Sequence, residues 1–154
     1  MLFYLCSKFP QVPIYGLVDF DPDGLGILST YKYGSVALAH CNEGLAVPKI
    51  IWLGVKSCEI FGYGVNSTYE EDCRHGERNA GSDKVGLLRL TPRDRRIAKS
   101  MLSREILWEE GREAAWRREL QVMLILNIKA EIQILSQSRG GLEGWLDGQL
   151  GEIV

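Results

Sequence analysis

The chain has 154 residues, of which 45% are apolar and 25% are charged, a composition typical of one globular domain and not of a disordered or collagen-like chain. Its net charge of −2 favours no particular partner, and no apolar run approaches the roughly 18 residues that cross a membrane. The four cysteines form no CxxC pair, which is typical of reduced thiols in an intracellular protein.

Two apolar segments near the N-terminus predict neighbouring strands. Residues 13–20 (PIYGLVDF) have the length of a buried strand, and residues 49–53 (KIIWL) form a second such run. Between them, apolar residues recur at helical spacing from about Gly24 to His40. A strand, a helix and a strand in this order form a βαβ unit. We therefore expect an α/β, Rossmann-like fold with a mostly parallel sheet flanked by helices.

The middle of the chain changes character. Residues 62–84 are rich in Gly, Asn, Ser and charged residues and have little apolar periodicity, which predicts a mobile surface insertion or a disordered linker. Order is expected to return at 85–90 (VGLLRL). A helix is then predicted to begin with Thr91 as its N-cap, Pro92 at its first position and Asp94 in its first turn. Three apolar residues would share its inner face: Ile97, Met101 and Trp108.

A longer helix is predicted over residues 112–137, ending before Gly140 and Gly141. Its apolar residues recur at helical spacing, so one face is expected to point inward. That face would contain Trp116, Leu120, Met123, Leu124, Ile128, and Ile134 or Leu135. The tail from Leu142 has no assigned structure.

Three aspartates follow the first predicted strand, in the string LVDFDPDG (17–24). Asp19 and Asp21 are two residues apart, so their side chains share one face of an extended chain, and Pro22 favours that conformation at Asp21. Two carboxylates at the end of a parallel strand repel each other unless a cation lies between them, and oxygen-only ligands favour Mg²⁺. The alternative is a solvated turn. Asp23 is expected to be the N-cap of the next helix rather than a third ligand.

A longer pattern around these aspartates resembles a known family. The strings VDFDPDGLGILSTYKYGS, VPKIIWLG, LTPRDRR, WRRELQVML and KAEIQIL resemble the Toprim domain found in the A subunit of topoisomerase VI and in its eukaryotic relative, the meiotic double-strand-break protein. The resemblance implies a Toprim-like domain over residues 1–140 and a C-terminal tail over 141–154. It also implies that Asp19 and Asp21 are the family's paired Mg²⁺-binding acids. Asp23 stands where the family has an aromatic residue or His, so it receives no role.

The resemblance further implies parts that this chain does not contain. In the family, a glutamate on an earlier Toprim strand completes the metal site, and a tyrosine in a preceding winged-helix domain attacks DNA. Both are expected upstream of Met1, so the domain is expected to be incomplete at its N-terminus and to lack its first strand. The isolated chain is then expected to hold no catalytic residue. The implied partners are DNA, a second copy in a homodimer and an ATPase B-type subunit. The implied setting is meiotic recombination in the nucleus.

The segment from Arg89 to Lys99 contains five basic residues and one acidic residue, Asp94. Such a segment either contacts DNA phosphates or is a solvated helix face. Its candidate DNA-binding residues are Arg93, Arg95, Arg96 and Lys99.

Two other functions remain open from the sequence. A haloacid-dehalogenase-type phosphohydrolase also has a DxD string after a strand, with the first acid as nucleophile, but Asp23 departs from its motif. The non-enzymatic alternative is a module for dimerisation or DNA docking that keeps the fold without the chemistry.

Overall fold

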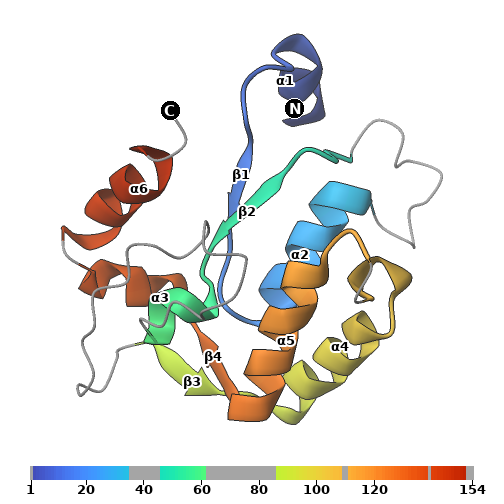
Figure 1. The fold of residues 1–154 in the computed structure, drawn as a ribbon, viewed down its shortest axis with the longest axis vertical. Coiled ribbons are helices and arrows are strands. Elements are labelled where there is room, and N and C mark those ends of the chain that lie inside the picture. The colour runs from blue at the N-terminus through green and yellow to red at the C-terminus, as the bar shows by residue number, and fades with distance from the viewer. Residues whose placement is uncertain (1, 35–45, 62–85, 109–110, 139, 152–154) are drawn as a thin grey trace.

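The computed structural model describes residues 2–34, 46–61, 86–108, 111–138 and 140–151 (Figure 1). The predicted insertion 62–84 lies outside these residues, as does the end of the helix predicted over 24–40. No helix in the described ranges is long and apolar enough to cross a membrane. In chain order the elements are α1 (Leu2–Lys8), β1 (Tyr15–Leu17), α2 (Pro22–Tyr33), β2 (Ile51–Gly54), α3 (Ser57–Phe61), β3 (Leu87–Arg89), α4 (Pro92–Leu102), η3 (Glu105–Leu107), α5 (Ala114–Leu126), β4 (Ile128–Ala130), η4 (Ile132–Gln137) and α6 (Gly141–Gly151).

The strands form two pairs joined by one bridge. β1 and β2 are parallel, with α2 between them in the sequence, which confirms the predicted strand–helix–strand order. β3 and β4 are antiparallel, and an isolated bridge between Phe20 and Ala130 connects β4 to the chain just after β1. The fold is therefore α/β with a parallel pair flanked by helices, and an antiparallel pair that the sequence did not predict is attached to it.

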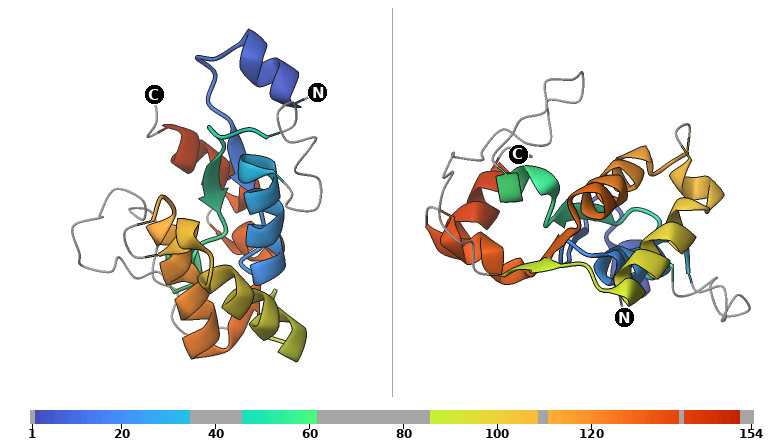
Figure 2. Two further views of the ribbon diagram at one scale, coloured as in Figure 1. Left: turned by 90° about the vertical axis from the view of Figure 1, so that its right-hand side faces the viewer. Right: turned by 90° about the horizontal axis from the view of Figure 1, so that it is seen from below.

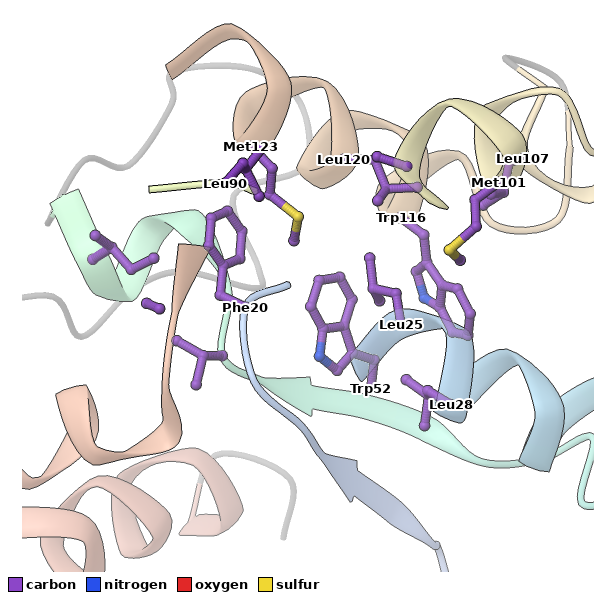
Figure 3. Packing of buried hydrophobic residues seen from close by; sticks show 14 of the residues in the cluster. Phe20, Leu25, Leu28, Trp52, Leu90, Met101, Leu107, Trp116, Leu120 and Met123 are labelled. Carbon is purple, nitrogen blue, oxygen red and sulfur yellow. The ribbon is translucent and has the colours of Figure 1, made fainter. Parts of the chain in front are cut away.

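The helices lie on both sides of the β1–β2 pair. In Figures 1 and 2, α2, α4 and α5 gather on one side, whereas α3 and α6 lie on the other. The core lies mainly under the first group (Figure 3). At its centre the rings of Trp52 and Trp116 meet edge to face with centroids 6.1 Å apart, an arrangement that aromatic quadrupoles favour. Phe20 and Leu25 are fully buried there, so the residues around the aspartates are anchored in the core.

The prediction of one long helix over 112–137 is wrong. α5 ends at Leu126 because Asn127 has a left-handed conformation (φ 56°), which asparagine tolerates better than most residues and which stops a helix. The chain then forms β4 and the short 3₁₀ helix η4. The inward-facing residues Trp116, Leu120 and Met123 are buried on α5 as expected.

The start of α4 is as predicted. Thr91 accepts a hydrogen bond from the Asp94 N–H, and Asp94 accepts one from the Thr91 N–H, which completes a capping box with Pro92 at the first helical position. Trp108, however, lies beyond α4 and is 54% exposed, so it does not share the inner face of this helix. Most of the tail forms α6, a helix that the sequence analysis did not assign.

Candidate metal and nucleic-acid site

The segment that contains the aspartates is held on both sides. Val18 N–H donates to the Gly54 carbonyl (2.8 Å) on the β2 side. Phe20 N–H donates to the Ala130 carbonyl (2.8 Å), and Ala130 N–H donates back (3.0 Å), on the β4 side. Asp19 lies between these two attachments, so its backbone position is fixed by two strands that are far apart in the sequence.

Each of the two paired acids accepts one backbone hydrogen bond. The Asp19 carboxylate accepts from the Ile132 N–H (2.8 Å) at the start of η4. Asp21 has an extended backbone (φ −150°, ψ 163°), as expected before Pro22, and its carboxylate accepts from the Gly24 N–H. Asp21 is therefore the N-cap of α2 and Asp23 lies in its first turn, so the prediction of Asp23 as the N-cap is wrong. The cause is that Pro22 occupies the first helical position and the helix begins two residues earlier than expected.

Gly24 is required by the close approach of the backbone at this point. A Cβ atom there would lie 2.7 Å from the Asp19 carbonyl oxygen and 3.0 Å from an Asp21 carboxylate oxygen. Any side chain would push these groups apart. The spacing DxDxxG thus serves the packing of the turn as well as the acids themselves.

The environment of Asp21 disfavours its ionised form. Burial raises the pKa of Asp21, and the negative charges of Asp19 and Asp23 raise it further, while the Gly24 hydrogen bond and the Lys129 charge act in the opposite direction. A carboxylate in this situation gains from a nearby cation. The donor set around it is oxygen only, which fits a hard divalent ion such as Mg²⁺. Among the described residues, no cluster of three or more His, Cys, Asp or Glu side chains could by itself enclose a metal.

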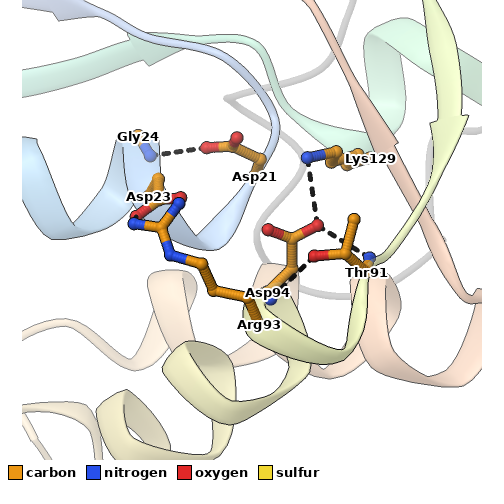
Figure 4. Close-up of polar contacts among 7 residues, drawn as sticks. All are labelled: Asp21, Asp23, Gly24, Thr91, Arg93, Asp94 and Lys129. Carbon is orange, nitrogen blue, oxygen red and sulfur yellow. Dashed lines mark hydrogen bonds and ion pairs between the residues drawn. The ribbon is translucent and has the colours of Figure 1, made fainter.

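The beginning of α4 lies beside these acids (Figure 4). Arg93 forms an ion pair with Asp23 at 3.3 Å, with the two side chains 70% and 39% exposed. The neighbouring Asp94 is buried and forms an ion pair with Lys129 of β4 at 3.0 Å. The site therefore combines acids that follow β1 with charged residues from α4 and β4.

The four basic candidates of α4 do not act as one group. At 100° per residue, Arg96 and Lys99 lie on the face of α4 opposite its buried side chains, Arg95 lies on one flank of the helix, and all three are exposed. Arg93 instead lies at the edge nearest the aspartates. Arg95 also donates to the Asn127 side chain (2.6 Å) at the end of α5, so part of its hydrogen-bonding capacity is used within the domain.

The sequence pattern did not indicate that Lys129, Arg93 and Asp94 lie beside the aspartates that follow β1. Lys129 lies in β4, which was predicted as part of a helix. The signal that could have found it is Asn127, a residue that favours helix ends and here stops α5.

Comparison with known proteins shows the family. Residues 1–141 match the model of the Toprim domain that is shared by Spo11 and the A-type subunit of topoisomerase 6. The chain belongs to this family. The match confirms the resemblance inferred from the sequence and with it the Toprim fold.

Three relatives illustrate how widely this part of the sequence is shared. The chain is 41% identical over 133 residues to "Meiotic recombination protein SPO11-1" of Oryza sativa subsp. japonica, covering 86% of this chain and 30% of the relative. It is 32% identical over 126 residues to "Meiotic recombination protein SPO11" of Homo sapiens (82% and 27%). It is 31% identical over 126 residues to the A-type subunit of the type 2 DNA topoisomerase 6 of Aeropyrum pernix (82% and 30%). The matched part of the chain thus spans about a third of the length of these relatives.

Proposed function

We propose that this chain is the metal-binding Toprim part of an enzyme that makes DNA double-strand breaks in meiotic recombination. The observation that carries the proposal is the pair Asp19 and Asp21, which follow the parallel strand β1 and are each fixed by a backbone amide. Family membership supports the strand-breaking role. Relatives named for meiotic recombination support a meiotic and therefore nuclear setting.

In this proposal Asp19 and Asp21 hold Mg²⁺ through the carboxylate oxygens that the Ile132 and Gly24 amides leave unused. Two carboxylates leave most coordination positions to water or to phosphate oxygens, so binding by the chain alone is weak. When bound, the ion supplies charge stabilisation at a DNA phosphate. The protein's own contribution is to fix the two acids between β2 and β4.

The outer face of α4, which carries Arg96 and Lys99, is proposed to contact DNA phosphates, whereas Arg93 and Arg95 lie nearer the acids and α5. Removing one side chain that binds a phosphate should lower the salt dependence of DNA binding by about one unit in the log–log slope. We expect Arg96→Glu combined with Lys99→Glu to reduce this slope in the full-length protein. An unchanged slope would show that the outer face of α4 is solvated and does not contact DNA phosphates.

The nucleophilic tyrosine and a third acid are proposed to come from outside these 154 residues. Tyr31 and Tyr33 lie at the far end of α2, about 15 Å and about 18 Å along the helix from Asp21. The isolated chain is therefore expected not to cut DNA, and the proposed partners of the longer enzyme are a second copy and an ATPase B-type subunit. The Toprim family match favours this role over the phosphohydrolase alternative. A non-catalytic docking module remains the second candidate, supported by the exposed basic face of α4.

The metal site can be tested by titrating the 154-residue chain with Mg²⁺ or Mn²⁺ and following its amide NMR signals. We expect shifts or broadening confined to residues 17–26 and their neighbours, and we expect Asp19→Ala or Asp21→Ala to abolish them. Asp147→Ala removes an exposed acid of α6 and should leave the response unchanged. If the wild-type chain gives no response, the two acids are a surface turn. Metal-dependent covalent cleavage of DNA by this chain would show that the nucleophile is misplaced.

A further inference from the structure

Lys129 is a lysine held in a fixed position beside the acids. It lies in β4 next to Ala130, whose backbone is bonded to Phe20 between Asp19 and Asp21. Its side chain is only 21% exposed, and its Nζ atom is 3.0 Å from an Asp94 oxygen. The ammonium group is thus brought to the acidic site by the strand pairing and not by a flexible loop.

The partner of Lys129 is itself immobilised. The Asp94 side chain is 4% exposed, and the oxygen that accepts from Lys129 also accepts from the Thr91 N–H (2.8 Å). Thr91 in turn accepts from the Asp94 N–H (3.2 Å). An acid locked in a capping box cannot follow the lysine if it moves, so Asp94 is a rigid anchor for the ammonium group.

The charge of Lys129 acts on the aspartates as well as on Asp94. The hydrogen bond to Asp94 raises the pKa of Lys129 against the effect of burial, and the charges of Asp94, Asp21 and Asp23 raise it further. Lys129 therefore remains a cation, and the same charge lowers the pKa of Asp21. Figure 4 shows its ammonium group pointing toward Asp94, while the carboxylate of Asp21 turns to Gly24.

The charges of the site are unequal in number. Asp21 interacts electrostatically with Asp19, Asp23 and Lys129, while Arg93 pairs with Asp23 and Lys129 with Asp94, so four carboxylates share two basic groups. The remaining two negative charges equal the charge of one divalent cation. Without Lys129 the excess would be larger and the attraction for a cation stronger.

We propose that Lys129 is a built-in counter-ion that limits how tightly this site binds a divalent cation, and that Asp94 is the positioning residue that keeps Lys129 off the Asp21 carboxylate. This inference rests on the proposed metal site at Asp19 and Asp21. The tethered ammonium reduces the repulsion among the acids while leaving their oxygens open. Released from Asp94, it would pair with Asp21 and compete with the metal directly.

The proposal predicts opposite effects for two neighbouring changes, measured as the Mg²⁺ and Mn²⁺ dissociation constants of the 154-residue chain at fixed ionic strength. Lys129→Met keeps the length of the side chain but removes its charge, and we expect about three- to tenfold tighter binding. Asp94→Asn keeps an oxygen for the Thr91 N–H but removes the negative charge that holds the Lys129 ammonium in place, and we expect binding to weaken by a similar factor. Lys129→Arg restores the charge and should stay within about twofold of wild type.

The double variant shows whether Asp94 acts through Lys129. If it does, Asp94→Asn weakens binding less in the Lys129→Met background than in the wild-type background, whereas independent charges would give the same factor in both. Lys49→Met, which removes an exposed charge just before β2, is the matched control and should change little.

Three outcomes separate the possibilities. If Lys129→Met changes the dissociation constant no more than Lys49→Met does, Lys129 is only a structural partner of Asp94 and the inference is wrong, although the metal site stands. If the wild-type chain binds neither ion, the metal site is wrong and the inference falls with it. If Asp94→Asn fails to fold, the contrast between Lys129→Met and Lys129→Arg still decides the role of the lysine charge.

Discussion

The two ends of α2 hold two clusters of charged side chains that differ in their balance. At the N-terminal end, the acidic cluster contains an excess of carboxylates over cations: Asp19, Asp21, Asp23 and Asp94 with Arg93 and Lys129. At the C-terminal end, the glutamate cluster consists of Glu113 with Lys32 and Tyr33. With 12 residues in α2, about 18 Å separate the two ends.

In the glutamate cluster every charge has a partner. Glu113 accepts a hydrogen bond from the Tyr33 hydroxyl (2.5 Å) and forms an ion pair with Lys32 (2.6 Å). The Lys32 ammonium also lies 5.6 Å from the ring of Trp116, within reach of a cation–π contact. The side chains of Glu113 and Lys32 are 10% and 18% exposed, so the cluster is a closed link between α2 and α5.

The difference separates stabilising charges from charges available to a ligand. A buried acid with all its partners present gives the fold rigidity and has nothing left to bind. In an acidic cluster with unbalanced charge, repulsion between the carboxylates lowers the free energy of unfolding, and binding of a cation raises it again. We therefore predict that mutations at the C-terminal end of α2 mainly change the free energy of unfolding, whereas mutations at its N-terminal end mainly change cation binding.

The largest expected effect on stability is that of Glu113→Ala. It leaves the Tyr33 hydroxyl and the Lys32 ammonium without their acceptor in a poorly solvated place, and we expect a loss of about 2 kcal/mol in the free energy of unfolding. Urea unfolding measures it. Asp23→Ala, which removes an exposed ion pair at the other end of α2, is the matched control and should cost less than about 0.5 kcal/mol. Equal losses would remove the distinction between the two clusters.

The next effect is a loss of stability at alkaline pH that depends on Tyr33. Burial raises the pKa of Tyr33 well above its ordinary value of 10.0, and the hydrogen bond to Glu113 and its charge raise it further. The folded protein therefore keeps this proton at a pH where the unfolded chain releases it. The stabilisation is complete below about pH 10 and is lost as the pH rises toward the folded value.

We expect the free energy of unfolding to fall above pH 10 with a contribution from this tyrosine of at most about 1.4 kcal/mol per pH unit. Tyr33→Phe should lower stability at pH 7 by about 1 kcal/mol and make the alkaline decline shallower. Lys129, whose pKa is also raised, contributes a decline of the same sign in both proteins. Tyr31→Phe, at a 52% exposed position, should leave the profile as it is. If the free energy of unfolding of Tyr33→Phe falls above pH 10 as steeply as that of the wild type, Tyr33 does not cause the alkaline loss of stability.

The sequence predicted the parts of the acidic cluster that are local in the chain. Pro22 was enough to predict the extended backbone of Asp21, because a proline acts on the residue before it. The shared metal-binding role of Asp19 and Asp21 stays a prediction. The capping box at Thr91 was partly visible because it also depends on residues close in sequence. The contributions of Arg93, Asp94 and Lys129 depend on where α4 and β4 pack, and no local pattern encodes that packing.

The glutamate cluster escaped prediction entirely. Glu113 and Tyr33 are 80 residues apart, and each has an ordinary sequence neighbourhood. The long helix predicted over 112–137 failed because tertiary pairing of β4 with β3 and Phe20 outweighs helical periodicity there. Family resemblance supplied the Toprim assignment, which periodicity alone left as a general α/β fold.

The smallest expected effect is a gain of stability at the acidic end, from Asp21→Asn. The raised pKa of Asp21 means that the folded state holds this proton to a higher pH than the unfolded chain does. Stabilisation from this group is present below its ordinary value of 3.8 and is lost as the pH rises through the folded value, so at pH 7 its ionisation costs stability. Asparagine removes that charge and keeps an oxygen for the Gly24 N–H.

We therefore expect Asp21→Asn to increase the free energy of unfolding by about 0.5 kcal/mol at pH 7 and to have no such benefit near pH 3, while it abolishes the NMR response to Mg²⁺. Asp94→Asn should instead decrease the free energy of unfolding at pH 7. Burial alone would raise the pKa of Asp94, but hydrogen bonds with the Thr91 N–H and Lys129 lower it below its ordinary value. Its ionised form thus stabilises the fold at neutral pH, and that contribution is lost as the pH falls through the folded pKa. If both variants were less stable at pH 7, Asp21 would belong with Glu113 as a structural acid. If the two variants change the free energy of unfolding in opposite directions, Asp21 is a carboxylate available to bind a cation, whereas Asp94 is already neutralised by Lys129.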